Sequence, residues 1–126
     1  MKNVRNAVLF CLIGLCLFCI LGCGKKADEN KPISEVKAEA EKMDTKGLRA
    51  MAMEYKEAIT AKKSEVDKLA AKVKEIPVGD MLGQEAKDLK ADLENLEKSV
   101  TALQERFKVY YDKLKEKGGD LSGLEI

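Results

Sequence analysis

The regular spacing of apolar residues toward the end of the chain most constrains its fold. Between residues 82 and 114 apolar residues recur in alternating steps of four and three without exception. The series is Leu82, Ala86, Leu89, Leu93, Leu96, Val100, Leu103, Phe107, Tyr110 and Leu114. This repeat puts one apolar stripe along one face of an α-helix, as in a coiled coil. It predicts a helix over about residues 81–117 that buries its stripe against another helix.

A less regular apolar stripe precedes it. Its members are Ile33, Val36, Ala40, Met43, Gly47, Met51, Tyr55, Ile59, Lys62, Val66, Leu69, Val73 and Ile76. Between Met43 and Ile59 every step is four residues, a stutter of the kind that locally unwinds a coiled coil. Pro32 suits the first turn of a helix. The pattern predicts a second helix over about residues 33–76.

The segment Ile76-Pro77-Val78-Gly79-Asp80 separates the two stripes. Pro77 lacks the N–H donor that a continuing helix needs, and Gly79 adds backbone freedom. The sequence therefore predicts a turn at residues 77–80 and an all-α fold, an antiparallel two-helix hairpin or coiled coil within residues 32–117. Residues 118–126 are expected to form a loose C-terminal tail.

The first 24 residues are of a different kind. Lys2 and Arg5 precede an unbroken apolar run from Ala7 to Leu21, and small residues follow. These are the parts of a secretory signal peptide. The run of about 15 residues is shorter than the roughly 20 that span a bilayer. An uncleaved anchor that includes residues 22–24, or an ordinary signal peptide, are the alternatives.

The end of this leader, Ile20-Leu21-Gly22-Cys23, resembles the lipobox of bacterial lipoproteins. The resemblance implies a signal peptide at residues 1–22, cut between Gly22 and Cys23. It also implies a diacylglycerol on the Cys23 sulfur and an acyl chain such as palmitate on the new amino terminus. More than one acyl chain is needed for lasting attachment to a membrane. The lipidated Cys and a flexible tether are expected over residues 23–31.

The remaining cysteines, Cys11, Cys16 and Cys19, each follow a large residue and do not fit the lipobox. They are interpreted as small hydrophobic residues of the leader. The mature chain then keeps one lipid-bearing sulfur and no disulfide. Lipidation implies a place in the cell envelope, facing away from the cytoplasm. By resemblance to the enterobacterial sorting rule, Gly24 after the lipid Cys favours the inner leaflet of the outer membrane, facing the periplasm.

The composition offers little for chemistry. The chain has no His, and no Cys follows residue 23, so no catalytic residues, cofactor or small-molecule substrate are expected. The formal charge of +1 gives no reason to expect nucleic-acid binding. Three acids, Glu85, Asp88 and Asp92, have one-turn spacing, but lysines lie beside them. A solvated helix face is therefore expected there, and no metal site.

One cluster of soft side chains is a candidate partner patch. Pairing of the two helices about the turn brings together Met51, Met53, Tyr55, Phe107, Tyr110 and Tyr111. Met and Tyr are adaptable contact residues, so the cluster is either a docking patch or the hairpin core with ordinary surface. One narrow seam buries little for about 80 residues, so a homo-oligomer or an envelope partner is expected.

These observations lead to a functional hypothesis. The chain is expected to be a membrane-anchored lipoprotein that presents a helical hairpin as an envelope scaffold, spacer or adaptor. Two alternatives stay open: a lipid-anchored accessory subunit of an envelope complex, and a small toxin-like or lysis-associated lipoprotein.

Overall fold

A computed structural model describes residues 26–126, which form three α-helices and no β-strand. The helices are α2 (Ile33–Lys42), α3 (Thr45–Glu75) and α4 (Gln84–Glu116), with the 3-10 turn η2 (Val78–Asp80) between the two long ones. The predicted all-α class is confirmed. The predicted signal peptide, its cleavage point at Gly22 and the lipid site at Cys23 lie outside the described residues.

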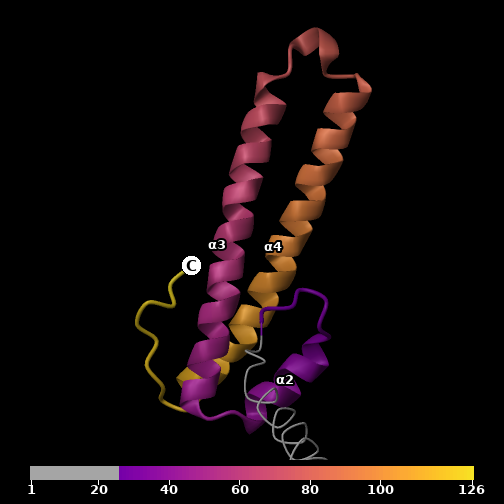
Figure 1. Ribbon diagram of the computed structural model, residues 1–126. Coiled ribbons are helices and arrows are strands. Elements are labelled where there is room, and N and C mark those ends of the chain that lie inside the picture. Colours follow the sequence, from indigo (N-terminus) through magenta and orange to yellow (C-terminus); the bar gives the residue numbers. More distant parts are fainter. Residues whose placement is uncertain (1–25) are drawn as a thin grey trace, which may run out of the picture.

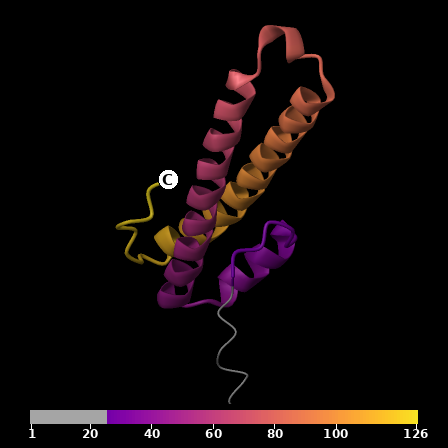
Figure 2. The ribbon, with the colours of Figure 1, turned by 45° about the horizontal axis from the view of Figure 1, so that its top comes forward.

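The two long helices dominate the molecule. Figure 1 shows α3 and α4 side by side, joined at one end by the turn that contains η2. At the other end α2 packs against α4, and the turned view in Figure 2 shows that α2 reaches only part of the way along it. Helix α4 begins at Gln84, because residues 81–83 still belong to the turn. Leu82, predicted to start the apolar stripe, is therefore 85% exposed.

The predicted single helix over residues 33–76 is wrong. The chain breaks after α2, where Met43 is extended at φ −83° and ψ 145°. Asp44 then caps α3, and its Oδ1 accepts a hydrogen bond from the Gly47 N–H at 2.8 Å. Such a cap contributes about 0.5–2 kcal/mol because it satisfies a backbone donor that the helix leaves free. Gly47 gives the cap room, since a Cβ there would lie 3.1 Å from Asp44 Oδ1.

The C-terminal tail is not loose, which corrects the prediction for residues 118–126. Gly118 has a φ of +68°, the left-handed conformation that commonly ends a helix, and the chain then turns back along α3. The Arg49 guanidinium donates to the carbonyls of Asp120 at 2.6 Å and Ser122 at 2.8 Å. Leu124 is only 1% exposed, so the tail contributes a side chain to the core.

The predicted flexible tether also differs from the structure over residues 26–31. The backbone N–H of Asp28 donates to the Tyr55 hydroxyl at 3.2 Å, and that hydroxyl donates to the Asp28 carbonyl at 3.1 Å. Farther along, Arg106 Nε donates to the Lys31 carbonyl at 2.8 Å. This segment is therefore packed on both long helices rather than free.

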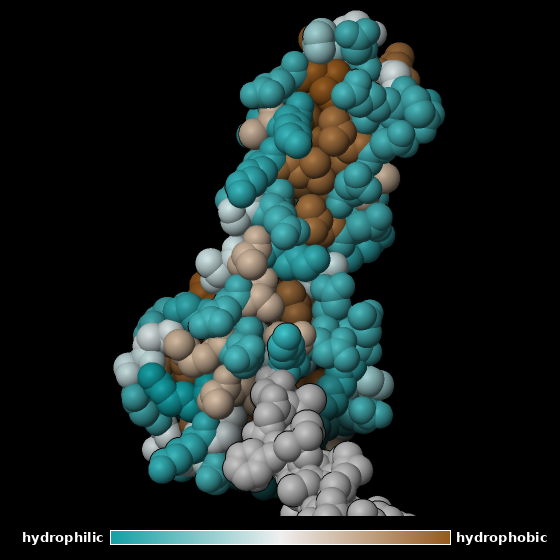
Figure 3. Space-filling model, viewed as in Figure 1, coloured by the Kyte–Doolittle hydropathy of each residue, from teal (hydrophilic) through white to brown (hydrophobic). Residues whose placement is uncertain are grey.

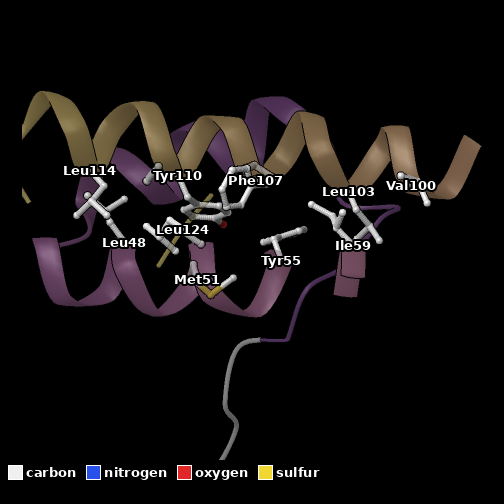
Figure 4. Close-up of a cluster of buried hydrophobic side chains, with 13 residues drawn as sticks. Leu48, Met51, Tyr55, Ile59, Val100, Leu103, Phe107, Tyr110, Leu114 and Leu124 are labelled. Carbon is white, nitrogen blue, oxygen red and sulfur yellow. The ribbon is translucent and has the colours of Figure 1, made fainter. Parts of the chain in front are cut away.

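The hydrophobic core lies at the end of the long helices where α2 packs. Figure 4 shows side chains of α3 and α4 meeting there with Leu124 of the tail. The Tyr55 and Tyr110 rings stack at its centre, with centroids 5.6 Å apart and planes inclined by 27°. Both tyrosines are fully buried. The two long helices are thus covered by other segments at the end where α2 packs. They lack comparable cover at the end that carries the turn.

Candidate interaction surfaces

The apolar side chains between α3 and α4 form a seam, and two regions of the molecule bury this seam to different extents. We call residues 26–59 and 100–126 the base, and residues 60–99 the distal arm. The base holds α2, the tail and one half of each long helix, whereas the distal arm holds the other halves and the turn. The two regions differ in how completely their apolar side chains are covered.

In the base, three extra segments cover the seam. Residues 27–31, α2 and the tail each contribute hydrogen bonds or apolar side chains to it. As a result, every buried apolar side chain in the described part of the chain lies in the base, with the single exception of Ala86. The base therefore has its own core and offers little unfilled apolar surface.

In the distal arm the seam is incompletely covered. Its large apolar side chains, which the bare pairing of two helices leaves half-buried, are Val66, Leu69, Val73, Ile76, Leu89, Leu93 and Leu96. At the tip, Val78 is 91% exposed and Leu82 is 85% exposed. Figure 3 shows the resulting hydrophobic band along the distal arm, bordered on both sides by hydrophilic residues. This band is made of half-buried apolar side chains of α3 and α4.

The two helices of the distal arm carry opposite net charge. Residues 60–75 contain five lysines and three acids, a net charge of +2. Residues 84–99 contain three lysines and five acids, a net charge of −2. Within residues 26–126 no ion pair joins these two stretches; the pair Glu94–Lys98, at 2.7 Å, lies within α4. All the charged residues of these two stretches are exposed except Lys62, which is half-buried.

Charged groups in the base, by contrast, hold its segments together. Lys113 Nζ lies 2.6 Å from Glu41 of α2 and 2.6 Å from Glu116 of its own helix. The hydrogen bond from Lys113 lowers the pKa of Glu41, and the carboxylates of Glu116 and Glu41 raise the pKa of Lys113. Lys117 Nζ adds a bond to the Met43 carbonyl at 2.7 Å, so the end of α2 is fastened to α4.

A buried hydroxyl strengthens the same junction. Tyr110 donates to Glu39 Oε2 at 3.1 Å, and Lys31 Nζ lies 2.6 Å from that same oxygen. Burial, followed by the nearby Glu39 carboxylate, raises the pKa of Tyr110 above its usual value. Tyr110 therefore remains a protonated donor and joins α4 to α2 within the core.

The candidate partner patch falls mostly inside this core. Tyr55 and Tyr110 are fully buried, and Met51 and Phe107 are 6% and 5% exposed. The remaining two residues, Met53 and Tyr111, are half-buried and pack against the core, with Tyr111 5.6 Å from Phe107 between ring centroids. The pairing of the helices does bring the six together, but four of them are inaccessible in this fold.

Two arginines that the sequence reasoning did not single out hold the terminal segments. Arg49 binds the tail, and Arg106, only 8% exposed, binds the segment before α2. They are the only arginines after the leader, in a chain that otherwise uses lysine. A guanidinium presents several donors in a fixed plane, which suits it to bridge backbone carbonyls. That unusual choice was the available signal.

The remaining surface offers no evident chemical site. An open groove of about 430 Å³ lies between α2 and α4. Positively charged lysines and negatively charged Asp and Glu side chains line it around Ala40 and Val109. In the part of the chain that the structure describes, no three His, Cys, Asp or Glu side chains gather as metal ligands, and Asp88 accepts a hydrogen bond from Gln84 at 2.8 Å. None of the described helices is both long and apolar enough to cross a bilayer.

Comparison with known proteins gives no relative from which a function can be transferred. No protein-family model matches the chain, and neither a curated protein nor a solved structure is similar to it. The features of this chain that bear on its function are therefore the leader sequence and the contrast between the base and the distal arm.

Proposed function

We propose that this chain is a bacterial lipoprotein that acts as a scaffold or adaptor in the cell envelope. Its antiparallel helical hairpin is held near a membrane by lipid on Cys23. The motif Ile20-Leu21-Gly22-Cys23 supports the attachment. The observation that carries the adaptor role is the half-buried apolar seam of the distal arm, which no other described segment covers.

The base is suited to hold such an arm. It closes its own core with α2 and the tail, and it fixes both terminal segments by hydrogen bonds from Arg49 and Arg106. Helices are stabilised chiefly by packing of their apolar faces, so a well-packed base supports the helices that extend from it. Residues 60–75 extend about 24 Å as a helix. That length is available for contact with a partner.

The position of the proposed lipid relative to the base sets the geometry at the membrane. Cys23 precedes Asp28 by five residues, and Asp28 is hydrogen-bonded to Tyr55. Five extended residues span at most about 17 Å. An acylated Cys23 therefore keeps the base close to the bilayer, a much shorter reach than a free tether through residue 31 would allow. Gly24 favours the inner leaflet of the outer membrane where the host has two membranes.

One observation favours the alternative of an accessory subunit that binds an envelope complex. Val78 and Leu82 are the two most exposed large apolar residues of the described chain, and both lie in the turn at the tip. A partner that received this tip would bury both. Ser in place of both residues would then abolish co-purification of that partner from crosslinked membranes while leaving membrane attachment intact.

The experiment that tests the attachment compares two cysteine variants in membranes. Mass spectrometry of the wild-type chain should find an amino terminus at Cys23 that carries diacylglycerol and a further acyl chain. Cys19→Ala is the matched control and should be modified in the same way. Cys23→Ala should lose the lipid and its processing before residue 23. An unmodified wild-type terminus at any other residue would contradict the proposal.

The adaptor role is tested in the same membranes. Pulldown with the wild-type chain should recover a protein that binds through the distal arm. The double substitution Leu69→Ser with Leu93→Ser should abolish recovery of that protein. The paired change Lys46→Ser with Lys108→Ser, on exposed positions of the base, is the control. Equal recovery with both double variants would show that the distal seam has no part in binding.

A further inference from the structure

We infer that the distal arm binds a second copy of this chain, with α3 of each copy beside α4 of the other. This inference extends beyond the proposed function because it names a second copy as what covers the seam, and it rests on that function only for the membrane attachment that concentrates the chain. It depends on the uncovered seam, on the charges that border it and on the symmetry of a dimer.

The half-buried seam of the distal arm would be buried more completely by a second apolar surface. The half-buried side chains of the distal arm alternate between the two helices, with Leu69 and Val73 from α3 and Leu89 and Leu93 from α4. A second pair of helices laid on this face would convert the two-helix seam into the core of a four-helix bundle, whose inward positions follow the same heptad spacing. In the base, α2 and the tail already provide comparable cover.

The charges select which helices pair. The α3 stretch, residues 60–75, has a net charge of +2, and the α4 stretch, residues 84–99, has a net charge of −2. No ion pair joins the two stretches within residues 26–126, and their charged residues other than Lys62 are exposed, so the net charge of each stretch can face another molecule. Complementary potentials bring opposite stretches together and disfavour like ones. Placing α3 beside α3 of the second copy would set two positive stretches against each other.

A two-fold dimer satisfies this preference twice. In an isologous interface, contact of α3 with the partner's α4 requires contact of α4 with the partner's α3. The opposite signs on the two helices make the distal arm complementary to itself under this symmetry. No such division is needed on the base, where Lys113 and Glu41 already pair within one chain at 2.6 Å.

The size of the surface indicates a weak association. Two helices about 10 Å wide over about 24 Å of length present roughly 500 Å². A specific interface of standard size uses roughly 800 Å² on each partner. We therefore expect a dimer that forms where the chain is concentrated, as on a membrane, where attachment raises the effective concentration.

Site-specific photocrosslinking of the full chain in membranes locates the interface. The photoreactive amino acid p-benzoylphenylalanine replaces Lys72 in the distal arm or, as the control, Lys46 in the base; both positions are exposed helix lysines. The Lys72 position should give a product with twice the mass of the chain, and the Lys46 position should give at least about tenfold less. Absence of that product or an equal yield at Lys46 would overturn the inference, as would a product with another protein at Lys72 in place of the dimer.

Charge reversal then tests the pairing of helices. One variant combines Lys68→Glu, Lys72→Glu and Lys74→Glu, and the other combines Glu85→Lys, Asp88→Lys and Asp92→Lys. For both, the photoreactive residue replaces Lys63, which neither set alters. Each variant alone should lose about tenfold in crosslinked dimer, because α3 and the partner's α4 then have the same sign. Co-expressed with different epitope tags, the two variants should form the mixed dimer again.

The mixed dimer also serves as the folding control, because only folded chains can restore it. If α3 instead paired with α3, the α4 variant alone would keep its dimer, and that result would overturn the arrangement. Failure to restore the mixed dimer would overturn it as well. The mass of the amino terminus reports lipid at Cys23 separately, so a failed dimer on an attached chain is distinguishable from a failed attachment.

Discussion

The base and the distal arm are built from the same two helices, and the stripe of α4 keeps one heptad spacing through both, yet only the base has a closed core. Leu114 and Leu89 lie on the same stripe of α4, but Leu114 is fully buried and Leu89 is half-buried. The difference comes from α2, residues 27–31 and the tail, which cover the base and reach the distal arm only at its edge, where Ser99 Oγ donates to Glu29 at 3.2 Å. A helical stripe therefore determines which face is turned inward, and the neighbouring segments determine how completely it is buried.

The largest expected effect is a loss of stability when leucine is replaced by alanine, compared between the base and the distal arm. Leu114→Ala should lower the free energy of unfolding by about 3 kcal/mol, because it opens a cavity in a covered core. Leu89→Ala, on the same helix, should cost about 1 kcal/mol, because the half-buried site loses less apolar contact. Urea unfolding followed by far-ultraviolet circular dichroism measures both. Equal losses would mean that the distal seam is as well covered as the base.

A somewhat smaller effect is expected at the tail. Leu124→Ala should cost about 2 kcal/mol, since this fully buried side chain is held by a short segment that can adjust to its loss. Ile126→Ala is the control, because Ile126 is 53% exposed, and it should change stability by less than about 0.5 kcal/mol. The same urea experiment separates the two. If Leu124→Ala leaves the free energy of unfolding unchanged, the tail is loose, as the sequence predicted.

The sequence predicted the parts of the fold that depend on local periodicity. The stripe from Ala86 to Leu114 gave α4 to within a few residues at each end, and Pro77 correctly marked the turn. The break at Met43 and Asp44 was not foreseen, because the apolar spacing continues across it. There the Asp44 cap and the packing of α2 on α4 outweigh the helical continuity that the stripe suggests.

The candidate site was predicted less well, for a related reason. The predicted cluster included both Tyr55 and Tyr110, but their stacking on each other is a finding of the structure. Sequence spacing alone does not show that short terminal segments fold back over these rings, because those segments have no period. The segments bind through Arg49 and Arg106 to backbone carbonyls, which any residue supplies and no pattern reveals. The covering of the base by these segments was therefore not predicted, and the distal arm leaves the large apolar side chains of its seam half-buried.

The next effect sharpens the origin of the break between α2 and α3. Asp44→Ala should cost about 1 kcal/mol through loss of the cap on the Gly47 N–H. Asp67→Ala, at an exposed position within the distal part of α3, should change stability by less than about 0.5 kcal/mol. Thermal unfolding of both variants gives the comparison. A cost at Asp44 no larger than at Asp67 would assign the break to the packing of α2 alone.

The smallest effect concerns pH and distinguishes ion pairs that join segments from those within one helix. Hydrogen bonding to Lys113 lowers the pKa of Glu41 below 4.5, and Lys98 does the same for Glu94. A carboxylate with a lowered pKa stabilises the fold above its unfolded pKa, and this contribution is lost as the pH falls through the folded pKa. Acidification from pH 6 to pH 3 should therefore weaken both pairs. Because Glu41 and Glu94 are exposed, each contribution is small.

Only the Glu41 pair joins α2 to α4, so only its loss should loosen the base. Amide hydrogen exchange of α2 should therefore quicken below about pH 4 in the wild type, after correction for the intrinsic pH dependence of exchange. Glu41→Gln should show fast exchange of α2 already at pH 6, whereas Glu94→Gln should leave α2 unchanged. If α2 exchanges at the same rate in both variants, the apolar core holds α2 on α4. The ion pairs of Lys113 then do not stabilise that packing.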